Sequence, residues 1–487
     1  MLLDGPQRWR ADPPNPGRPG QARPGAAGTD RTGEPGPRDR DQDGEEPEYA
    51  LPPLVDQYGT GVSHGELGLG SFESLLAEAV GSHGPAPPGT TFFDTWVGLA
   101  VRRWCPPLLG LAPHCTPAHY LAARREVGAY RATRLLLRSS GVGAYLLADA
   151  GGGTDEAGAV DLAGGSCPAG RPYSAGGSHA VGDPYPARGP RPAGGPYPAG
   201  GPHPAAGGFA VAGCRVGLGA RAVPDAGDAP FSAAELASAA DAPVHRVLPL
   251  RRFAGRLADA ATSTRGFLDA LADSLAPAPQ HVVALALTVD GPLPGAAPDG
   301  AAVWRAADHW LRDRRPGPSP AAPALVHHLL WSAVASGLPV QLHCRERVDV
   351  GAFLAATRGY GTHLVLLPGP GPRAGAGAGA GQDHLWAARL AALFPHVYAD
   401  AGPAPQETLR HAPFGKLMFA TGAWALPELY VVAARQFTEA MGRLVREWTA
   451  DGVCAEPDAW RIAALVAAGT ARRVYRLPAP AGSSTTG

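Results

Sequence analysis

The stretch GLPVQLHC, residues 337–344, decides the fold. Its apolar side chains alternate with Pro339, Gln341 and His343, which is the period of a β-strand, and it follows a helical run at residues 324–336. From residue 324 onward the chain repeats a helix, a short loop, a short apolar strand and a loop. This alternation predicts a parallel sheet covered by helices.

Eight such strands, each followed by a helix, predict a (β/α)8 barrel of the TIM type, with α/β as its fold class. His343 ends its strand, and in these barrels the chemistry sits at the C-terminal ends of the strands. A histidine there suggests a metal site. The expected strands span residues 54–58, 143–147, 244–250, 281–289, 338–343, 362–367, 396–401 and 416–421.

Composition divides the 487 residues into one barrel domain and several low-complexity segments, which hold many of the 66 Gly and 53 Pro. The barrel is expected at residues 49–477, and residues 150–208 and 369–382 are expected to be flexible insertions in it. Residues 1–48 are poor in aliphatic side chains, which predicts a disordered leader that could include a misassigned translation start. Residues 478–487 are expected to be a disordered tail.

Charge and cysteine content narrow the class of protein. The net charge of −1 gives no reason to expect a nucleic-acid partner or binding to a membrane surface. The six cysteines are scattered without a CxxC pair, and we expect them to be reduced thiols. No apolar run is long enough to span a bilayer, and no signal peptide is recognised. We therefore expect a soluble, cytoplasmic protein.

Six stretches of the chain carry a resemblance to a known family. They are VDQYGTGV (55–62), PPGTTFFDTWVGLAVRRWC (87–105), LVHHLLWSAVASGLPVQLHC (325–344), FPHVYADAG (394–402), APFGKLMFATGAWALPELY (412–430) and AAGTARRVYRL (467–477). Through them, most of residues 51–477 resembles the metal-dependent amidohydrolase superfamily, and in particular the amidohydrolase-related branch that also occurs fused to glutamine-synthetase-like domains. The resemblance implies a metal-dependent hydrolase of amide or other C–N bonds.

The ligand set that the resemblance implies is mostly replaced. Such enzymes hold divalent metals with an HxH pair on the first strand, histidines on the fifth and sixth strands and an aspartate on the eighth. Only His343, in the fifth-strand position, is retained, and the stretch at 283–288 has no lysine. A catalytic zinc site normally keeps three protein ligands. The positions of the missing ligands carry Tyr58, Thr60, Pro368 and Gly422.

We therefore predict a degenerate, non-catalytic barrel that keeps a binding role for a small polar molecule or a protein partner, with no cofactor and no confident catalytic residue. One alternative is an active, divergent hydrolase that binds zinc through His343 with relocated ligands such as His64, Asp56 or Asp400. Another is an interaction module that acts through the insertion. The pocket candidates are Tyr58, Thr60, His343, Asp400, Gly422 and Glu428, with His343 as the single metal-ligand position.

Overall fold

The computed structural model describes residues 51–80, 82, 86–148, 230–275, 281–313, 322–344, 347–369 and 378–479. The predicted leader, the insertion at 150–208 and nearly all of the predicted tail lie outside the described residues. Within the described part, no helix is both long and apolar enough to cross a membrane.

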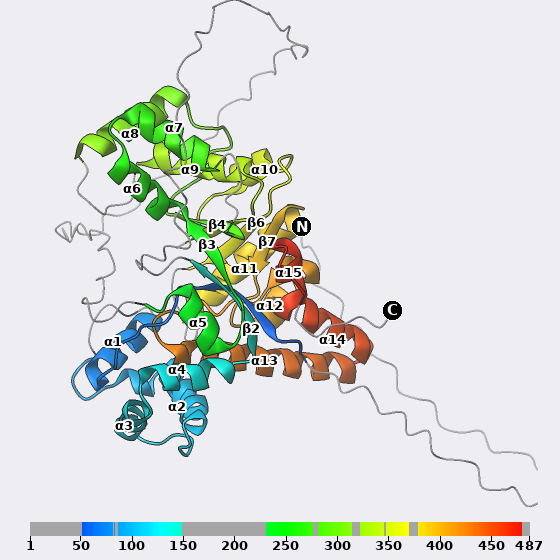
Figure 1. Ribbon diagram of the computed structural model, residues 1–487. Coiled ribbons are helices and arrows are strands. Elements are labelled where there is room, and N and C mark those ends of the chain that lie inside the picture. Colours follow the sequence, from blue (N-terminus) through cyan, green and yellow to red (C-terminus); the bar gives the residue numbers. More distant parts are fainter. Residues whose placement is uncertain are drawn as a thin grey trace, which may run out of the picture. The chain divides into compact units, whose positions relative to one another are not determined.

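Eight parallel strands form one sheet in the order β1-β2-β3-β4-β5-β6-β7-β8, surrounded by helices (Figure 1). This confirms the predicted (β/α)8 barrel. All eight predicted strands are present, with ends that differ by a few residues. They are β1 (Leu54–Gly59), β2 (Val142–Ala148), β3 (Val244–Pro249), β4 (Ala284–Val289), β5 (Val340–Cys344), β6 (Leu364–Pro368), β7 (Val397–Asp400) and β8 (Leu417–Met418).

Hydrogen bonds from β1 to the segment that follows β8 bring the two edges of the sheet together. The backbone N–H of Gln57 donates to Phe419 O at 3.2 Å, and that of Gly422 donates to Tyr58 O at 2.9 Å. The buried carboxylate of Asp56 accepts bonds from the backbone N–H of Thr421 at 2.8 Å and from its hydroxyl at 2.6 Å. Asp56 therefore holds this seam.

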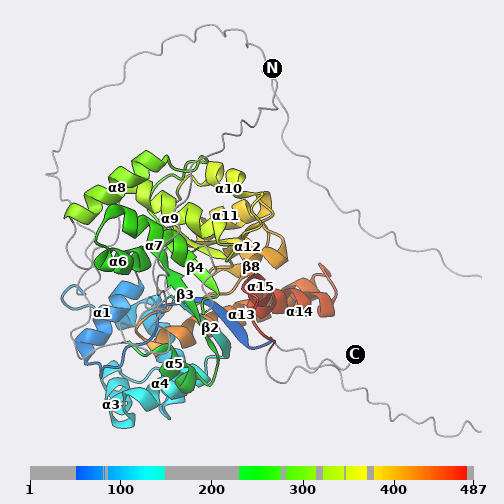
Figure 2. The same cartoon turned by 45° about the horizontal axis from the view of Figure 1, so that its top comes forward.

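Helices cover the outside of the sheet, and two groups of them stay together in both views: α1–α4, and α6–α9 (Figures 1 and 2). The helices are α1 (Leu69–Ala79), α2 (Trp96–Leu108), α3 (Pro117–Val127), α4 (Ala129–Arg138), α5 (Ala233–Ala240), α6 (Leu250–Ala260), α7 (Thr264–Leu275), α8 (Gly300–Asp313), α9 (Pro323–Ala335), α10 (Gly351–Thr357), α11 (Ala378–Leu393), α12 (Pro405–Thr408), α13 (Pro427–Ala450), α14 (Glu456–Ala464) and α15 (Thr470–Val474).

Four helices, α5, α6, α7 and α11, differ from what the sequence predicts. The helical pattern at 256–275 predicts a single helix, but the structure has two, α6 and α7, because Ser263 Oγ accepts a hydrogen bond from Gly266 N at 3.1 Å and starts a new helix. Helix α5 was not predicted, although Ser232 and Glu235 form a capping box at its N-terminus. Helix α11 begins at Ala378, inside the stretch expected to be an insertion.

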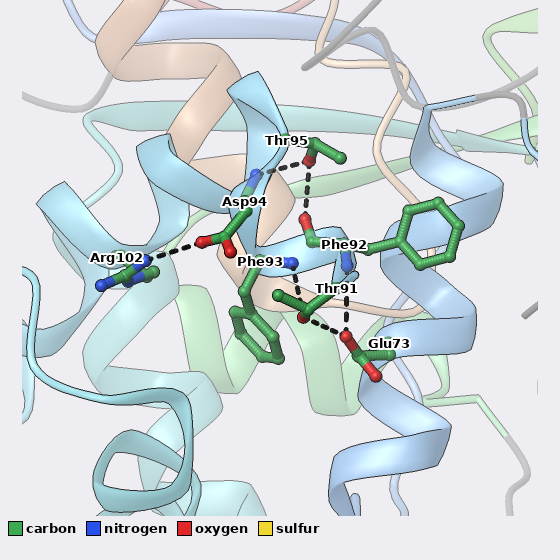
Figure 3. Close-up of polar contacts among 8 residues, drawn as sticks. Glu73, Thr91, Phe92, Phe93, Asp94, Thr95 and Arg102 are labelled. Carbon is green, nitrogen blue, oxygen red and sulfur yellow. Dashed lines mark hydrogen bonds and ion pairs between the residues drawn. The ribbon is translucent and has the colours of Figure 1, made fainter. Parts of the chain in front are cut away.

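The stretch TTFFDTW at 90–96 forms the corner between α1 and α2 (Figure 3). The carboxylate of Glu73, on α1, accepts hydrogen bonds from the Thr91 hydroxyl and from Phe92 N. Thr95 caps α2 by accepting a bond from Gly98 N at 3.1 Å. A Cβ at Gly98 would lie 2.3 Å from Phe92 O, so only glycine fits this tight corner.

The core has two parts, one inside the barrel and one between the strands and the helices. Short side chains such as Ala144, Ala284 and Ala286 fill much of the interior, together with a polar group made by Gln57, Gln341 and Tyr475. The Tyr475 hydroxyl donates to Gln57 Oε1 and accepts from Gln341 Nε2, both at 3.0 Å. Tyr475, the residue directly after α15, therefore contributes its side chain to the barrel interior.

Candidate functional site at the barrel mouth

His343 lies against Tyr58 at the C-terminal ends of β5 and β1, which form the mouth of the barrel. The two ring centroids are 4.4 Å apart, with an angle of 54° between the ring planes. His343 is 6 % exposed and Tyr58 is 7 % exposed. The position that the resemblance assigns to a first-strand ligand is thus held by an aromatic ring packed on the one retained histidine.

Asp400, at the end of β7, pairs with a histidine that the sequence reasoning missed. His384 Nδ1, from α11, lies 3.2 Å from Asp400 Oδ2, and both side chains are buried. An imidazole nitrogen and a carboxylate oxygen therefore face each other in a buried setting. Gly402 packs directly on the His384 ring, since a Cβ there would lie 2.6 Å from the ring Cγ.

Thr60 and Gly422 take part in the structure through their backbones. Thr60 N donates to Ala423 O at 3.1 Å, next to the bond from Gly422 N to Tyr58 O. Gly422 has a φ of +59°, which suits glycine at the turn after β8. These two positions shape the edge of the mouth near Tyr58 and have no carboxylate or imidazole to offer a metal.

Glu428, at the start of α13, is fully buried and binds helix α3. Its Oε1 accepts hydrogen bonds from the Tyr120 hydroxyl at 2.8 Å and from Arg124 Nε at 2.9 Å. Burial and then the Glu428 charge raise the pKa of Tyr120 well above its ordinary value, so the phenol remains a hydrogen-bond donor. The structure therefore places Glu428 in a joint between helices.

His64, Cys344 and His327 have structural roles in the fold. His64 pairs with Glu235 at 3.2 Å and packs on the Phe231 ring. Cys344 points away from the barrel interior into the outer core, and burial raises its pKa to about 12, so its thiol stays protonated. His327 accepts a hydrogen bond from Trp331 Nε1 on the same helix at 2.9 Å.

The described side chains at the mouth form no group that fits a catalytic divalent metal. Among the described residues, no three His, Cys, Asp or Glu side chains lie together in a group that could hold a metal ion. β6 ends at Pro368, which offers no side-chain ligand. A catalytic zinc needs about three protein ligands, and the described part of the chain gathers no such group.

The sequence does not mark His384 as a site residue, because the barrel pattern singles out only residues at strand ends. His384 lies in a helix, and its approach to Asp400 depends on how α11 packs on β7. The one local hint is Gly402, two residues after Asp400, whose positive φ of 70° and missing Cβ admit the ring. A glycine alone does not say which side chain fills the space beside it.

Comparisons with known proteins bear on the fold. No family model and no curated protein matches this sequence. Among solved structures, the chain is similar to a "putative metal-dependent hydrolase" from Lactobacillus casei ATCC 334, with a TM-score of 0.58 and 15 % identity over 88 % of this chain and 96 % of that one. Uronate isomerase from Thermotoga maritima matches with a TM-score of 0.38 and 12 % identity over 50 % of this chain and 65 % of that one. The first likeness shows that this chain shares the barrel fold of that protein.

Proposed function

We propose that this protein is a non-catalytic barrel of the metal-dependent hydrolase type, which has kept a binding role for a small polar molecule or a protein partner. The observation that carries the proposal is the packing of Tyr58 on His343. Tyr58 covers the ring face of His343, and two other ligand positions hold Gly422 and Pro368, which have no side-chain ligand. This set of residues is poorly suited to bind a metal.

The burial of the mouth supports the same proposal. His343, Tyr58 and Asp400 are at most 7 % exposed, whereas a hydrolase must bring a substrate bond and a water to its reacting groups. Below them, Gln57, Gln341 and Tyr475 hydrogen-bond to one another instead of leaving a polar cavity. The polar side chains at the centre of this barrel thus bond to one another.

The test is elemental analysis of the purified full-length protein beside a His343→Ala variant, with circular dichroism as a check on folding. We expect less than about one metal ion per ten chains in both samples, since a single ligand binds metal weakly. Near-stoichiometric metal that disappears in the variant would contradict the proposal and would support a metal-dependent hydrolase.

A second candidate function is an active but divergent hydrolase, and the His384–Asp400 pair favours it. An imidazole held by a carboxylate is a common general base, and it could activate water for attack on an amide. Hydrolysis of a panel of small amides, measured for the native chain and for Asp400→Asn, tests this candidate. Activity that falls at least about 100-fold in the variant would establish it.

A further inference from the structure

A groove on the outside of the barrel, far in sequence from the mouth residues, has the dimensions of a ligand site. It has a volume of about 480 Å³ and lies between the corner that joins α6 to α7 and one face of α8. Small-molecule sites usually measure about 300–1,000 Å³. The three helices lie together in both views (Figures 1 and 2). Its lining residues include Thr262, Ser263, Arg265, Trp304, Asp308 and Arg312.

The groove exists because the chain breaks its helix at Ser263. Residues 261–263 separate α6 from α7, and the Thr264 hydroxyl donates to Asp308 Oδ1 at 3.0 Å, which ties the corner to α8. Trp304, Asp308 and Arg312 recur every four residues along α8, so they share one face of that helix. The walls of the groove are therefore the α6–α7 corner and α8, and a hydrogen bond joins them.

Trp304 gives one wall of the groove an open aromatic surface. Its side chain is 44 % exposed, although tryptophan is normally among the more buried residues. An indole face that borders a groove is suited to stack on a flat ring. This wall favours a ligand with a planar ring.

Two arginines give the groove its charge. Arg265 lies 3.6 Å from Asp269 and Arg312 lies 2.6 Å from Asp308, but both guanidinium groups are more than 70 % exposed. Such surface pairs are weak, and each guanidinium has five N–H donors, so both can still bind an anion. The lining holds two arginines against the single acid Asp308, which favours a carboxylate or phosphate.

We infer that this groove binds a small anion that carries a planar ring, with the ring on Trp304 and the anionic group on Arg265 and Arg312. Two sources share this chemistry, namely aromatic carboxylates and nucleoside monophosphates. This inference is independent of the metal content and the reactivity of the barrel mouth, because no residue of the mouth lines the groove.

The test is isothermal titration calorimetry on the full-length protein with four probes: indole-3-acetate, adenosine monophosphate, adenosine and inorganic phosphate. We expect one or both ring-bearing anions to bind at least tenfold more tightly than adenosine, which lacks the charge, and than phosphate, which lacks the ring. The stronger of the first two identifies the source. If neither ring-bearing anion binds more tightly than the other two probes, the inference is wrong.

Variants locate the binding. Trp304→Ala and Arg265→Gln should each weaken the preferred anion by about tenfold, whereas Trp96→Ala, which removes another exposed tryptophan (77 %), should leave it unchanged. Asp308→Asn keeps the hydrogen-bond acceptor for Thr264 and removes the groove's negative charge, so it should tighten binding about threefold or more. A gain of affinity cannot arise from misfolding. Equal affinities in all four variants would place the ligand elsewhere and overturn the assignment.

Discussion

At the scale of single residues, the packing at the barrel mouth depends on how closely the Gly402 backbone approaches the His384 ring. Gly402 combines a φ of +70° with direct contact to His384, which in turn pairs with Asp400. With an added methyl group, residue 402 would have a disfavoured backbone conformation, and the methyl group would clash with the His384 ring.

Gly402→Ala should therefore lower the free energy of unfolding by about 2 kcal/mol or more, measured by urea denaturation. The matched control is Gly452→Ala, since Gly452 has a φ of +67° but nothing within 4 Å of an added Cβ. That control should lose only the conformational part, about 1–2 kcal/mol. Equal losses in the two variants would mean that His384 is not held against Gly402.

At the scale of the elements, the helices that precede β2 are fixed to α13 by a buried charge pair. Arg124 on α3 and Glu428 on α13 have side chains that are 4 % and 0 % exposed, and Tyr120 adds a second hydrogen bond to the same carboxylate oxygen. Removing one charge leaves the other buried without compensation.

Glu428→Gln should destabilise the protein by about 3–5 kcal/mol, because Arg124 would keep its charge in a buried place. Chemical denaturation measures this loss. Glu439→Gln is the control, since Glu439 pairs with Arg103 at 3.0 Å between the neighbouring helices α13 and α2, but with side chains 38 % and 54 % exposed. Its loss should stay below about 1 kcal/mol. Comparable losses would argue that the buried pair contributes little.

At the scale of the whole molecule, stability at alkaline pH should depend on Lys416, the only lysine in the sequence. Its ammonium lies next to β8, donates to Phe394 O, Pro395 O and Val397 O, and sits 4.4 Å from the centroid of the Tyr398 ring. Burial and then the charge of Arg473 lower the pKa of Lys416 to about 8.

Between about pH 8 and pH 10 the unfolded chain holds a proton at Lys416 that the folded chain has already lost, so this group makes stability rise with pH. Lys416→Arg removes the effect because arginine stays charged. The native protein should therefore gain stability relative to this variant as pH rises from 8 to 10, as measured by urea denaturation. Both proteins keep the same cysteines and tyrosines, so parallel pH profiles would rule out the lowered pKa.

The sequence by itself determined the barrel. Eight short apolar strands separated by helical patterns can bury their side chains in few ways, and the one found is a nearly closed parallel sheet. It also marked Tyr58, His343 and Asp400 as strand-end residues, because the two-residue period of a strand is local. The break at Ser263 is also local, because Ser263 Oγ accepts a hydrogen bond from Gly266 N, but the helical pattern at 256–275 did not predict it.

Only the tertiary structure decided which of these residues meet. The Tyr58–His343 contact joins residues 285 positions apart in sequence, as the numbering shows, and the pairs His384–Asp400 and Arg124–Glu428 each join a helix to another element. The groove beside Trp304 likewise depends on the packing of α8 against the corner before α7. Periodicity fixes which way a side chain faces on its own element, but the partner depends on the packing of elements that are distant in sequence.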